Sequence, residues 1–570
     1  MKIVKKYWPL IIVIAFGLLA GKGLIGSGYF NMHDDLQMMR QLEMEKCFLT
    51  LQIPCRWIPD MGYGFGFPLF NFYPPLPYLF GEIFRVFGVA FVDTAKLTFI
   101  FAFIASGVSM YYLAKEFWGK WGGIISAVFY IWAPYHSVDI YVRGAMNEAW
   151  GIIFFPAILA SSYKLITQEK NKTRNIILLA LSWVGLLLSH NLMAMIFAPV
   201  FAGWCIIWLV KICDRKNLRK VITKGLQIAI AGGLAFGLVA FFTLPVTLEQ
   251  NLVHTETLIQ GYYDYSAHFA TIRQLLFSRF WGYGPSVWGA NDGLSFQVGT
   301  LYWGISIVIL GIIAYVIARR KKIKWEVAAP LIFFFLIGWF AIFMIHNKST
   351  PIWLHIQTLR YVQFPWRFLT LVVLSFSFMS GAIVKFIPKN YVYYVGSFLI
   401  IAVLLYSWDY FLPQHGHLGA LTDQQKFTGA AWDLQQTAGI YDYLPKTAKT
   451  APKAPMKYLA EILSGKGNVT NVKEGTNKDS FDISIPGDSE IRLGVFEFPD
   501  WKTFVDGKEV SNFVPKNEEW GRMHLIIPAG NHHVEVKLYD TPVRTLGNVL
   551  SLVSWIGLAG YLMLQFKRGR

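Results

Sequence analysis

Charged residues are scarce in this chain of 570 residues. They make up 15% of it, whereas hydrophobic residues make up 54% and aromatic residues 17%. Soluble globular domains carry about 25% charged residues, so the composition excludes a soluble protein of this size. Apolar stretches long enough to cross a bilayer recur from residue 8 to about 408, and again from about 547 to 565. The sequence therefore predicts a bundle of membrane helices.

Nucleotide-binding and common hydrolase motifs are also missing. No Walker loop, dinucleotide glycine fingerprint, HExxH, paired CxxC or GxSxG occurs in the context that it requires. Energy from a cytoplasmic nucleotide is therefore not expected. An outward-facing membrane enzyme then needs a pre-activated donor, which a lipid carrier supplies in the plane of the bilayer.

Only four cysteines are present, too few for a disulfide scaffold. Cys205 and Cys213 fall within or at the inner end of a predicted span. Cys47 and Cys55 fall in the first outer loop, where oxidation is permitted. Two interpretations are open for this second pair: a bridge, or two free thiols.

The net charge of +17 reports membrane topology and not nucleic-acid binding. Lys and Arg form short runs between apolar segments, without the interleaved aromatics of a nucleic-acid patch. By the positive-inside rule these runs are cytoplasmic. They occupy residues 2–6, 164–174, 211–224, 319–324 and 567–570.

Twelve spans follow from this reading, and the N-terminal one is expected to be a retained helix because no signal-cleavage site follows it. They lie near 8–26, 94–114, 121–134, 147–163, 176–190, 192–210, 225–244, 299–318, 326–345, 369–386, 391–408 and 547–565. The apolar stretch 76–90, interrupted by Glu82 and Arg85, either crosses as a thirteenth span or is re-entrant. The outer segments are then 27–75, 135–146, 245–298 and 346–368.

Residues 409–546 change character. Short alternating segments such as SFDISIP, EIRLGVFEF and HHVEVKLY predict strands, and the turns in VDGKEV and IPAGNHHV fit hairpins of a small jelly-roll sandwich. Because the following helix ends in KRGR, this domain must be extracytoplasmic. We therefore expect a helical domain over 1–408 that includes the outer loop 27–75, a β domain over 409–546, and a membrane helix within 547–570.

Asp34 and Asp35, beside His33, open the first outer loop. Adjacent carboxylates at a membrane surface repel each other, so a catalytic base, a divalent-cation ligand or a phosphate-site organiser is suggested. The alternative is an N-cap for the helix predicted in HDDLQMMRQLEMEK. One aspartate can cap the helix while the other does chemistry.

A second polar group lies in PYHSVDIYVRGAMNEAWG, where Asp139, Arg143 and Glu148 fall between two spans on the outer side. They either build a polar site at the mouth of the bundle or form a structural ion pair. His190 and Asn191 interrupt apolar sequence at the same depth. They indicate either function or hydrogen bonding between helices.

The third group is LRYVQFPWRFLTL, which places Arg360 and Arg367 beside Phe364 and Trp366 at the start of a span. Arginine binds phosphate through two donors, and aromatic rings line acyl or prenyl grooves. An interfacial aromatic belt with snorkelling arginines explains the same pattern.

These motifs together resemble a known family. The layout of one helix, an acidic outer loop and then GYGFGFPLFNFYPPLPY resembles polytopic glycosyltransferases of the GT-C class. The order of HDD, that aromatic segment, DIYVRGAMNE, LSHN, RYVQFPWRF, YDYLPK, PDWKTFVDGK and DTPVR is similar to bacterial YfhO-type membrane proteins and their 6-pyruvoyl-tetrahydropterin-synthase-related relatives. The resemblance covers nearly the whole chain. Nothing like a zinc-binding histidine triad accompanies it, so the pterin-synthase part of the name is discounted.

The resemblance implies an enzyme that transfers a sugar, with inversion, from a polyprenyl-phosphate carrier to an extracytoplasmic acceptor. It assigns Asp34 or Asp35 as the base and Asp139 or Glu148 as a second acidic site. It assigns binding of the donor phosphate to Arg143, Arg360 and Arg367. Some relatives use a divalent cation, Mg or Mn, and Asp34 and Asp139 are the positions that could hold one here, although no spacing compels it. The remaining substrate-pocket residues are His33, Arg56, Tyr63, Tyr73, His190 and Trp366.

Two other functions account for part of the pattern: a non-enzymatic transporter or flippase of a lipid-linked glycan, and a surface scaffold that displays the β domain. A transporter places acidic residues at the midplane in broken helices, whereas here they gather in outer loops. The sequence favours a multi-pass enzyme of the plasma membrane.

Overall fold

The computed structural model describes residues 2–213, 218–287, 289, 291–414 and 421–568. The chain forms two compact units. The first comprises Met1–Asp35, Val92–Ala235 and Ile259–Leu421, and the second comprises Leu36–Phe91, Phe236–Leu258 and Thr422–Arg570. Each unit has its own packing.

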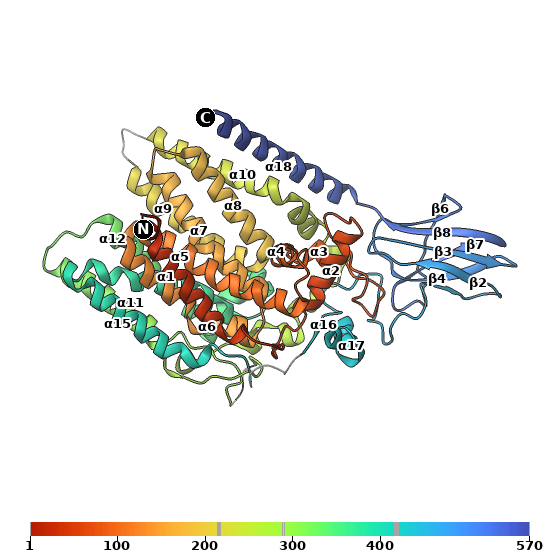
Figure 1. Ribbon diagram of the computed structural model, residues 1–570, viewed down its shortest axis with the longest axis horizontal. Helices are drawn as coiled ribbons and strands as arrows, with labels where there is room; N and C mark the ends of the chain where they lie inside the picture. Colours follow the sequence, from red (N-terminus) through yellow and green to blue (C-terminus); the bar gives the residue numbers. More distant parts are fainter. Residues whose placement is uncertain (1, 214–217, 288, 290, 415–420, 569–570) are drawn as a thin grey trace. The chain divides into compact units, whose positions relative to one another are not determined.

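The first unit is a helical bundle (Figure 1). Within it, α7 packs on α8 and α9, and α14 packs on α11 and α12. Its helices are α1 (Lys2–Ala20), α5 (Phe91–Ile131), α6 (Pro134–Ser137), α7 (Met146–Thr167), α8 (Lys172–Ser189), α9 (Asn191–Ile212), the first part of α10 (Leu218–Leu248), α11 (Thr300–Ala318), α12 (Trp325–Ile345), α13 (Thr350–His355), α14 (Leu369–Ser380) and α15 (Val392–Ser407).

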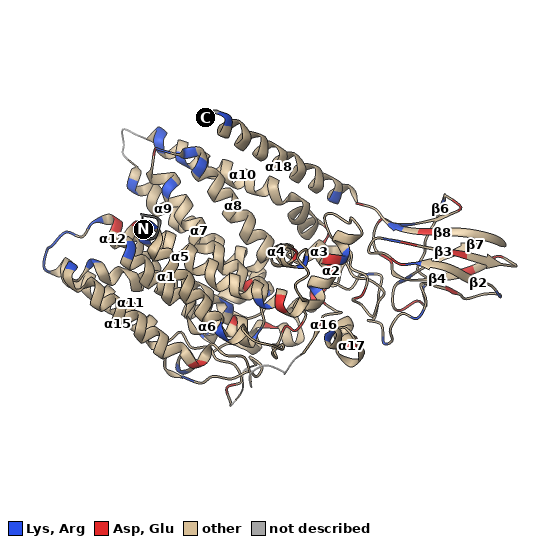
Figure 2. Ribbon diagram, in the orientation of Figure 1, with Lys and Arg blue, Asp and Glu red and all other residues tan. Residues whose placement is uncertain are grey.

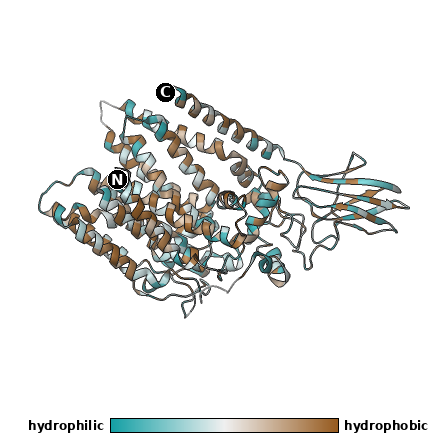
Figure 3. Cartoon of the chain, in the orientation of Figure 1, coloured by the Kyte–Doolittle hydropathy of each residue, from teal (hydrophilic) through white to brown (hydrophobic). Residues whose placement is uncertain are grey.

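Eleven helices in the described residues of the whole chain are long and apolar enough to cross a membrane. Their apolar character is evident in Figure 3. The predicted polytopic bundle is thereby confirmed.

The longest of these helices, α5, contains two of the predicted spans. Gly119 breaks it with φ 77° and ψ −174°, a conformation that glycine adopts without strain. The halves lie antiparallel, because a Cβ on Gly107 would meet Ile131 and one on Gly123 would meet Tyr111. The eleven apolar helices therefore provide the twelve predicted spans.

The short helix α4 (Leu76–Arg85) settles the question of residues 76–90. Ten residues at 1.5 Å each extend about 15 Å, half the thickness of the hydrocarbon core. This helix is too short to cross, so the alternative of a thirteenth span is wrong, and the re-entrant alternative stays a prediction.

The basic runs of the first unit share one end of its helices. Lys164, near the end of α7, pairs with Glu116 at 2.8 Å, and Lys211 of α9 contacts Glu326 of α12. The connection between α11 and α12 carries Lys and Arg along its length (Figure 2). Glu148 lies at the opposite end of α7, roughly 24 Å from Lys164 along the helix axis.

The second unit combines short helices with a β domain. Its helices are α2 (Gln37–Leu49), α3 (Leu69–Phe72), α4, the end of α10, α16 (Asp423–Lys426), α17 (Gly429–Thr437) and α18 (Pro542–Arg568). The helix predicted after Asp35 is confirmed as α2. It packs on α4, where Tyr78 donates to Gln37 at 2.7 Å and Arg85 donates to Glu45 at 2.6 Å. The helix α18 lies along α10, with Trp555 donating to the carbonyl of Leu238 at 3.0 Å.

Eight strands form two antiparallel sheets with the orders β1-β4-β7 and β2-β3-β8-β5-β6. They are β1 (Ala460–Ile462), β2 (Asn468–Lys473), β3 (Lys478–Ile485), β4 (Ser489–Phe496), β5 (Trp501–Val505), β6 (Lys508–Val510), β7 (Arg522–Ile527) and β8 (Gly530–Leu538). Consecutive strands alternate between the sheets from β3 to β5 and from β6 to β8, as in a jelly roll. The predicted sandwich is confirmed.

The two predicted hairpins differ in outcome. In VDGKEV, Asp506 and Gly507 have positive φ and join β5 to β6 as a paired hairpin. In IPAGNHHV the prediction of a hairpin is wrong, because β7 and β8 belong to different sheets. The turn there carries the chain from one sheet to the other.

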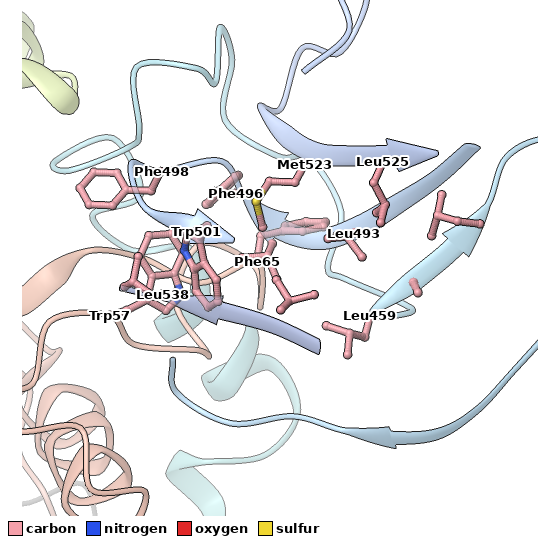
Figure 4. Packing of buried hydrophobic residues seen from close by; sticks show 14 of the residues in the cluster. Trp57, Phe65, Leu459, Leu493, Phe496, Phe498, Trp501, Met523, Leu525 and Leu538 are labelled. Atoms are coloured by element: carbon pink, nitrogen blue, oxygen red, sulfur yellow. The ribbon is translucent and has the colours of Figure 1, made fainter. Parts of the chain in front are cut away.

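The core of the sandwich extends into the first outer loop. Leu493 and Phe496 of β4 and Leu525 of β7 are buried in this cluster, and Trp57 and Phe65 of the loop join them (Figure 4). The Trp57 ring meets the Trp501 ring edge-on at 5.4 Å. The outer loop thus shares a core with the β domain, although the sequence grouped it with the helices.

Cys47 and Cys55 form a disulfide across a separation of eight residues, with Cα atoms 5.5 Å apart. Of the two interpretations left open, the bridge is therefore the one found. Cys205 and Cys213 are free.

Thiol labelling tests the bridge. Denatured protein isolated without reductant is expected to react with maleimide at Cys205 and Cys213 only, and at all four cysteines after reduction. Replacing Cys47 and Cys55 by alanine should lower stability by roughly 2–3 kcal/mol, because the bridge closes a short loop. The Cys205→Ser/Cys213→Ser variant is the control for labelling, and four reactive thiols before reduction would contradict the bridge.

Candidate functional site

A buried carboxylate at the first turn of α7 organises the end of the bundle that lies opposite the basic runs. Glu148 is 1% exposed and accepts three hydrogen bonds. Arg143 donates to Oε2 at 2.8 Å and Arg367 at 3.2 Å, while the Tyr135 hydroxyl donates to Oε1 at 2.5 Å. The N-terminal end of a helix favours a negative charge as well. Glu148 is therefore an ionised anchor for two guanidinium groups.

Arg143 lies between two carboxylates. It contacts Asp139, which is fully buried in the turn η2 (Val138–Val142), and its guanidinium lies over the Trp366 ring at 4.3 Å. Burial lowers the pKa of Arg143, but the charges of Glu148 and Asp139 outweigh it and raise that pKa. For Asp139, burial and repulsion from Glu148 raise the pKa against the pull of Arg143.

Arg367 reaches the same carboxylate from a distant part of the chain. It lies on η10 (Pro365–Phe368) and also donates to the carbonyl of Val362 at 2.8 Å and to the Gln363 side chain at 2.9 Å. Gln363 has φ 64°, which turns the chain between η9 (Gln357–Val362) and η10. The neighbouring rings of Phe364 and Trp366 stack at 4.8 Å.

Arg360 stands apart from this cluster. It lies on η9, is half-buried, and within the described residues takes part in no ion pair. Its charge acts on Tyr265 of η6 (Tyr265–His268), which packs against η10. Arg360 is thus a basic group that, among the described residues, no carboxylate pairs with.

His190 lies beside the ion pairs at the junction of α8 and α9. Its Nδ1 accepts from the backbone of Met193 at 3.4 Å and caps α9. Burial lowers the pKa of His190 to about 3, with the charges of Arg367 and Arg143 acting in the same direction. The imidazole is therefore neutral and adds no charge to the cluster.

The His33–Asp34 segment pairs with the chain next to Arg143. The His33 amide donates to the carbonyl of Val142 at 3.0 Å, and the Asp34 amide donates to that of Arg143 at 2.8 Å. Asp34 and Asp35 are half-buried, while one carboxylate oxygen of Asp35 is enclosed. Asp34 thus lies at the rim of the cluster.

The N-cap position of α2 is Leu36, which makes no side-chain capping hydrogen bond. The helix begins at Gln37, so neither Asp34 nor Asp35 occupies the N-cap position that the sequence suggested for them.

Three predicted substrate-pocket residues belong to the second unit and have partners there. Arg56 pairs with Asp540 at 3.2 Å, Tyr63 joins the edge of the β-domain core, and the Tyr73 ring lies 4.4 Å beneath Arg40. Their assignment to the substrate pocket stays a prediction.

The arrangement does not suit a divalent cation at Asp139. Arg143 already contacts Asp139, and two guanidinium groups border Glu148. In the part of the chain that the structure describes, no group of three or more His, Cys, Asp or Glu residues could hold a metal ion. The predicted cation between Asp34 and Asp139 gains no support from these contacts.

Two members of the cluster were not singled out by sequence reasoning. Tyr135 and Gln363 lie inside the motifs PYHSVDIY and RYVQFPWRF. Uncharged polar residues carry no pattern that separates them from their neighbours, so only their position in a charged motif could have identified them.

Comparison with known families gives a direct result. The family model described as 6-pyruvoyl-tetrahydropterin synthase related domain, membrane protein, matches residues 70–412. The chain belongs to this family. The match confirms the resemblance carried by the motifs and includes Asp139, Glu148 and Arg367. No curated protein matches the sequence of this chain.

Several solved structures are similar to this chain. They include the arabinofuranosyltransferase AftD from mycobacteria, with a TM-score of 0.44, 12% identity, and coverage of 72% of this chain and 27% of that one. The apo oligosaccharyltransferase from Archaeoglobus fulgidus has a TM-score of 0.47 and 12% identity, with 80% and 62% covered. Archaeoglobus fulgidus AglB with an inhibitory peptide and a dolichol-phosphate has a TM-score of 0.42 and 13% identity, also with 80% and 62% covered. This chain therefore spans less than two thirds of each.

Glu148 and Asp139 make different numbers of contacts with the arginines, so their replacement should lower the stability of the protein by different amounts. Glu148→Gln leaves two buried guanidinium groups short of a partner, which should lower stability by about 3–5 kcal/mol. Asp139→Asn removes one contact of one arginine and should cost less than half as much. Thermal unfolding in detergent measures both. Equal losses in the two variants would contradict Glu148 as the anchor.

Proposed function

We propose that this protein is a membrane glycosyltransferase that moves a sugar from a polyprenyl-phosphate-linked donor to an acceptor outside the cytoplasmic membrane. The observation that carries the proposal is the arginine cluster held by Glu148, with the half-buried Asp34 at its rim. The acidic outer loop with Asp34 is part of the layout that resembles the GT-C class, and DIYVRGAMNE and RYVQFPWRF, which supply the arginines, are among the motifs that resemble YfhO-type membrane proteins. Glu148 and Asp34 lie at the end of the helices opposite the basic runs. By the positive-inside rule the basic runs are cytoplasmic, so we take the end with Glu148 and Asp34 to be extracytoplasmic.

In the proposed reaction the acceptor hydroxyl oxygen attacks the anomeric carbon from the face opposite the phosphate. A carbon–oxygen bond forms to the acceptor as the bond to the phosphate oxygen breaks, which inverts the configuration. The hydroxyl proton passes to the Asp34 carboxylate, and polyprenyl phosphate leaves with the bonding electron pair. A positioned carboxylate base suits the first event, and guanidinium groups offset the charge of the second.

The two buried acids have a different role from Asp34. Glu148 accepts three hydrogen bonds and Asp139 is fully buried against Arg143, so neither carboxylate is presented to an acceptor. They position Arg143 and Arg367. Holding charged groups in place before reaction is what makes electrostatic stabilisation effective.

The donor phosphate is assigned to the arginines by their charge balance. Arg143 and Arg367 are opposed by Asp139 and Glu148, whereas Arg360 has no such partner in the described chain. Arg360 therefore offers the uncompensated charge that a phosphate needs.

Replacing the proposed base tests the reaction. Asp34→Asn is expected to lower glycan transfer about 100- to 10,000-fold, the range for loss of a general base. Asp35→Asn is the matched control and should stay within about tenfold of wild type. Mass spectrometry of cell-surface glycans measures transfer, with protein level followed by immunoblot. Unchanged glycans in Asp34→Asn, or accumulation of unflipped lipid-linked glycan in its place, would favour the transporter.

Arg360→Ala tests the donor site. Loss of one charge-assisted hydrogen bond of about 1.5–3 kcal/mol should lower kcat/KM roughly 10- to 150-fold, with Arg360→Lys retaining part of the activity. The matched control is Arg319→Ala at the other end of the helices. Equal activity of Arg360→Ala and Arg319→Ala would remove Arg360 from the donor site.

A further inference from the structure

The β domain contains a polar cavity of about 520 Å³ that the proposed reaction does not use. It lies on the three-stranded sheet β1-β4-β7 and beneath the loop that leads into β7. Glu490 and Arg492 come from β4, Arg522 and His524 from β7, and Glu518 and Trp520 from the loop. Its volume falls within the range of about 300–1,000 Å³ usual for small-ligand sites.

The strand alternation places these side chains on the outer face of the sheet. Ile491 and Leu493 of β4 and Leu525 of β7 belong to the sandwich core, so the residues between them face away from it. Arg492 lies directly opposite His524 in the antiparallel register. The polar lining is therefore built by the pleat of the sheet and is not a chance grouping of long surface side chains.

A hydrogen-bond network fixes this lining. Glu518, which is 6% exposed, accepts from Arg522 at 3.0 Å and lies 3.3 Å from His524 Nε2. The other ring nitrogen of His524 lies 2.7 Å from Glu490. Although burial opposes it, His524 and Arg522 bring the pKa of Glu518 down to about 2. The cavity thus presents planar charged groups held in fixed orientations.

Aromatic rings complete the cavity. The Arg522 guanidinium lies 4.6 Å over the Trp520 ring, and Phe65 meets the same ring edge-on at 5.9 Å. Phe513 also lines the cavity and is 39% exposed. Rings fixed from behind are rigid platforms with little entropy to lose on binding.

The charge balance narrows the class of ligand. Three carboxylates, those of Glu490, Glu518 and Glu519, oppose two guanidinium groups. A strongly anionic ligand such as nucleic acid meets too much negative charge here. Glu490 and Glu518 are already paired with His524 and Arg522, so these two carboxylates are poor ligands for a cation.

We propose that this cavity binds a carbohydrate. A sugar presents vicinal hydroxyls that donate and accept at once, which matches fixed carboxylate and guanidinium groups, and an apolar C–H face, which matches an aromatic ring. The ligand chemistry is that of a neutral or weakly charged glycan. Its role as the captured acceptor rests on the proposed function, whereas the binding itself does not.

Binding to the full-length protein in lipid nanodiscs tests the inference. Fluorescently labelled protein is applied to an array of neutral, amino-sugar and acidic oligosaccharides, with a peptide array beside it, and the best oligosaccharide is then titrated. Trp520→Ala should weaken its binding about tenfold or more. Asn517→Ala/Glu519→Gln, which alters two exposed lining residues, should weaken it severalfold.

Matched controls are Tyr458→Ala, an exposed aromatic residue of the same unit, and Glu509→Gln on β6, both outside the cavity lining. These variants should bind as wild type does. No oligosaccharide binding by wild type, binding of peptides only, or full binding by both cavity variants overturns the inference.

The two proposals fail separately. Asp34→Asn should keep oligosaccharide binding while transfer is lost. Binding that depends on the cavity in a protein without transfer activity leaves this inference standing and removes the glycosyltransferase. Normal sugar transfer in a protein that binds no oligosaccharide would leave the glycosyltransferase proposal standing and remove the carbohydrate site.

Discussion

The end of the helical bundle opposite the basic runs depends on the Glu148 carboxylate. Two guanidinium groups buried among membrane helices are costly unless a negative charge meets them with good geometry. Glu148 supplies that charge at the start of α7, where the helix dipole adds to its stability. Because Arg143 and Arg367 come from segments more than 200 residues apart, this single residue fixes how those segments meet. The Arg143 backbone in turn holds Asp34.

This constraint separates the acids that hold the arginines from the acid at the rim. A carboxylate that accepts three hydrogen bonds has no free direction for a substrate proton. Asp34 lies half-buried at the rim, where its backbone amide pairs with Arg143. Among the described residues Arg143 and Arg367 pair with carboxylates, whereas Arg360 takes part in no ion pair. The sequence does not show which carboxylates and arginines are already paired with each other, because these pairs form between residues that the fold brings together.

Much of the fold follows from the sequence because membrane helices are specified by length, hydropathy and flanking charge. Even the two spans on either side of Gly119 were separable, since the glycine lies between basic residues. The β7–β8 connection was not predictable in the same way. A Pro-Ala-Gly turn signals a change of direction, but pairing of the strands depends on packing between sheets.

The site was predictable in part. Charged residues in outer loops identified Asp139, Arg143, Glu148 and Arg367, because charges at a membrane boundary need partners. Arg360 and Arg367 looked equivalent, and the turn at Gln363 decides which of them reaches Glu148. Local sequence does not encode that choice, since φ at a glutamine is set by the contacts around it.

The two polar sites differ in what their surroundings allow. In the bundle, low dielectric strengthens every charge pair and punishes any unpaired group, so Glu148 and its arginines form a fixed frame that cannot exchange partners readily. On the open face of the β sandwich, water competes for each hydrogen bond, and exposed groups such as Asn517 and Glu519 can exchange water for ligand hydroxyls at small cost. Transfer of a group from a phosphate depends on charged residues that are already held in place, as Glu148 holds its arginines. Reversible binding of a polar chain depends instead on groups that can exchange water for ligand, as on the face of the sandwich.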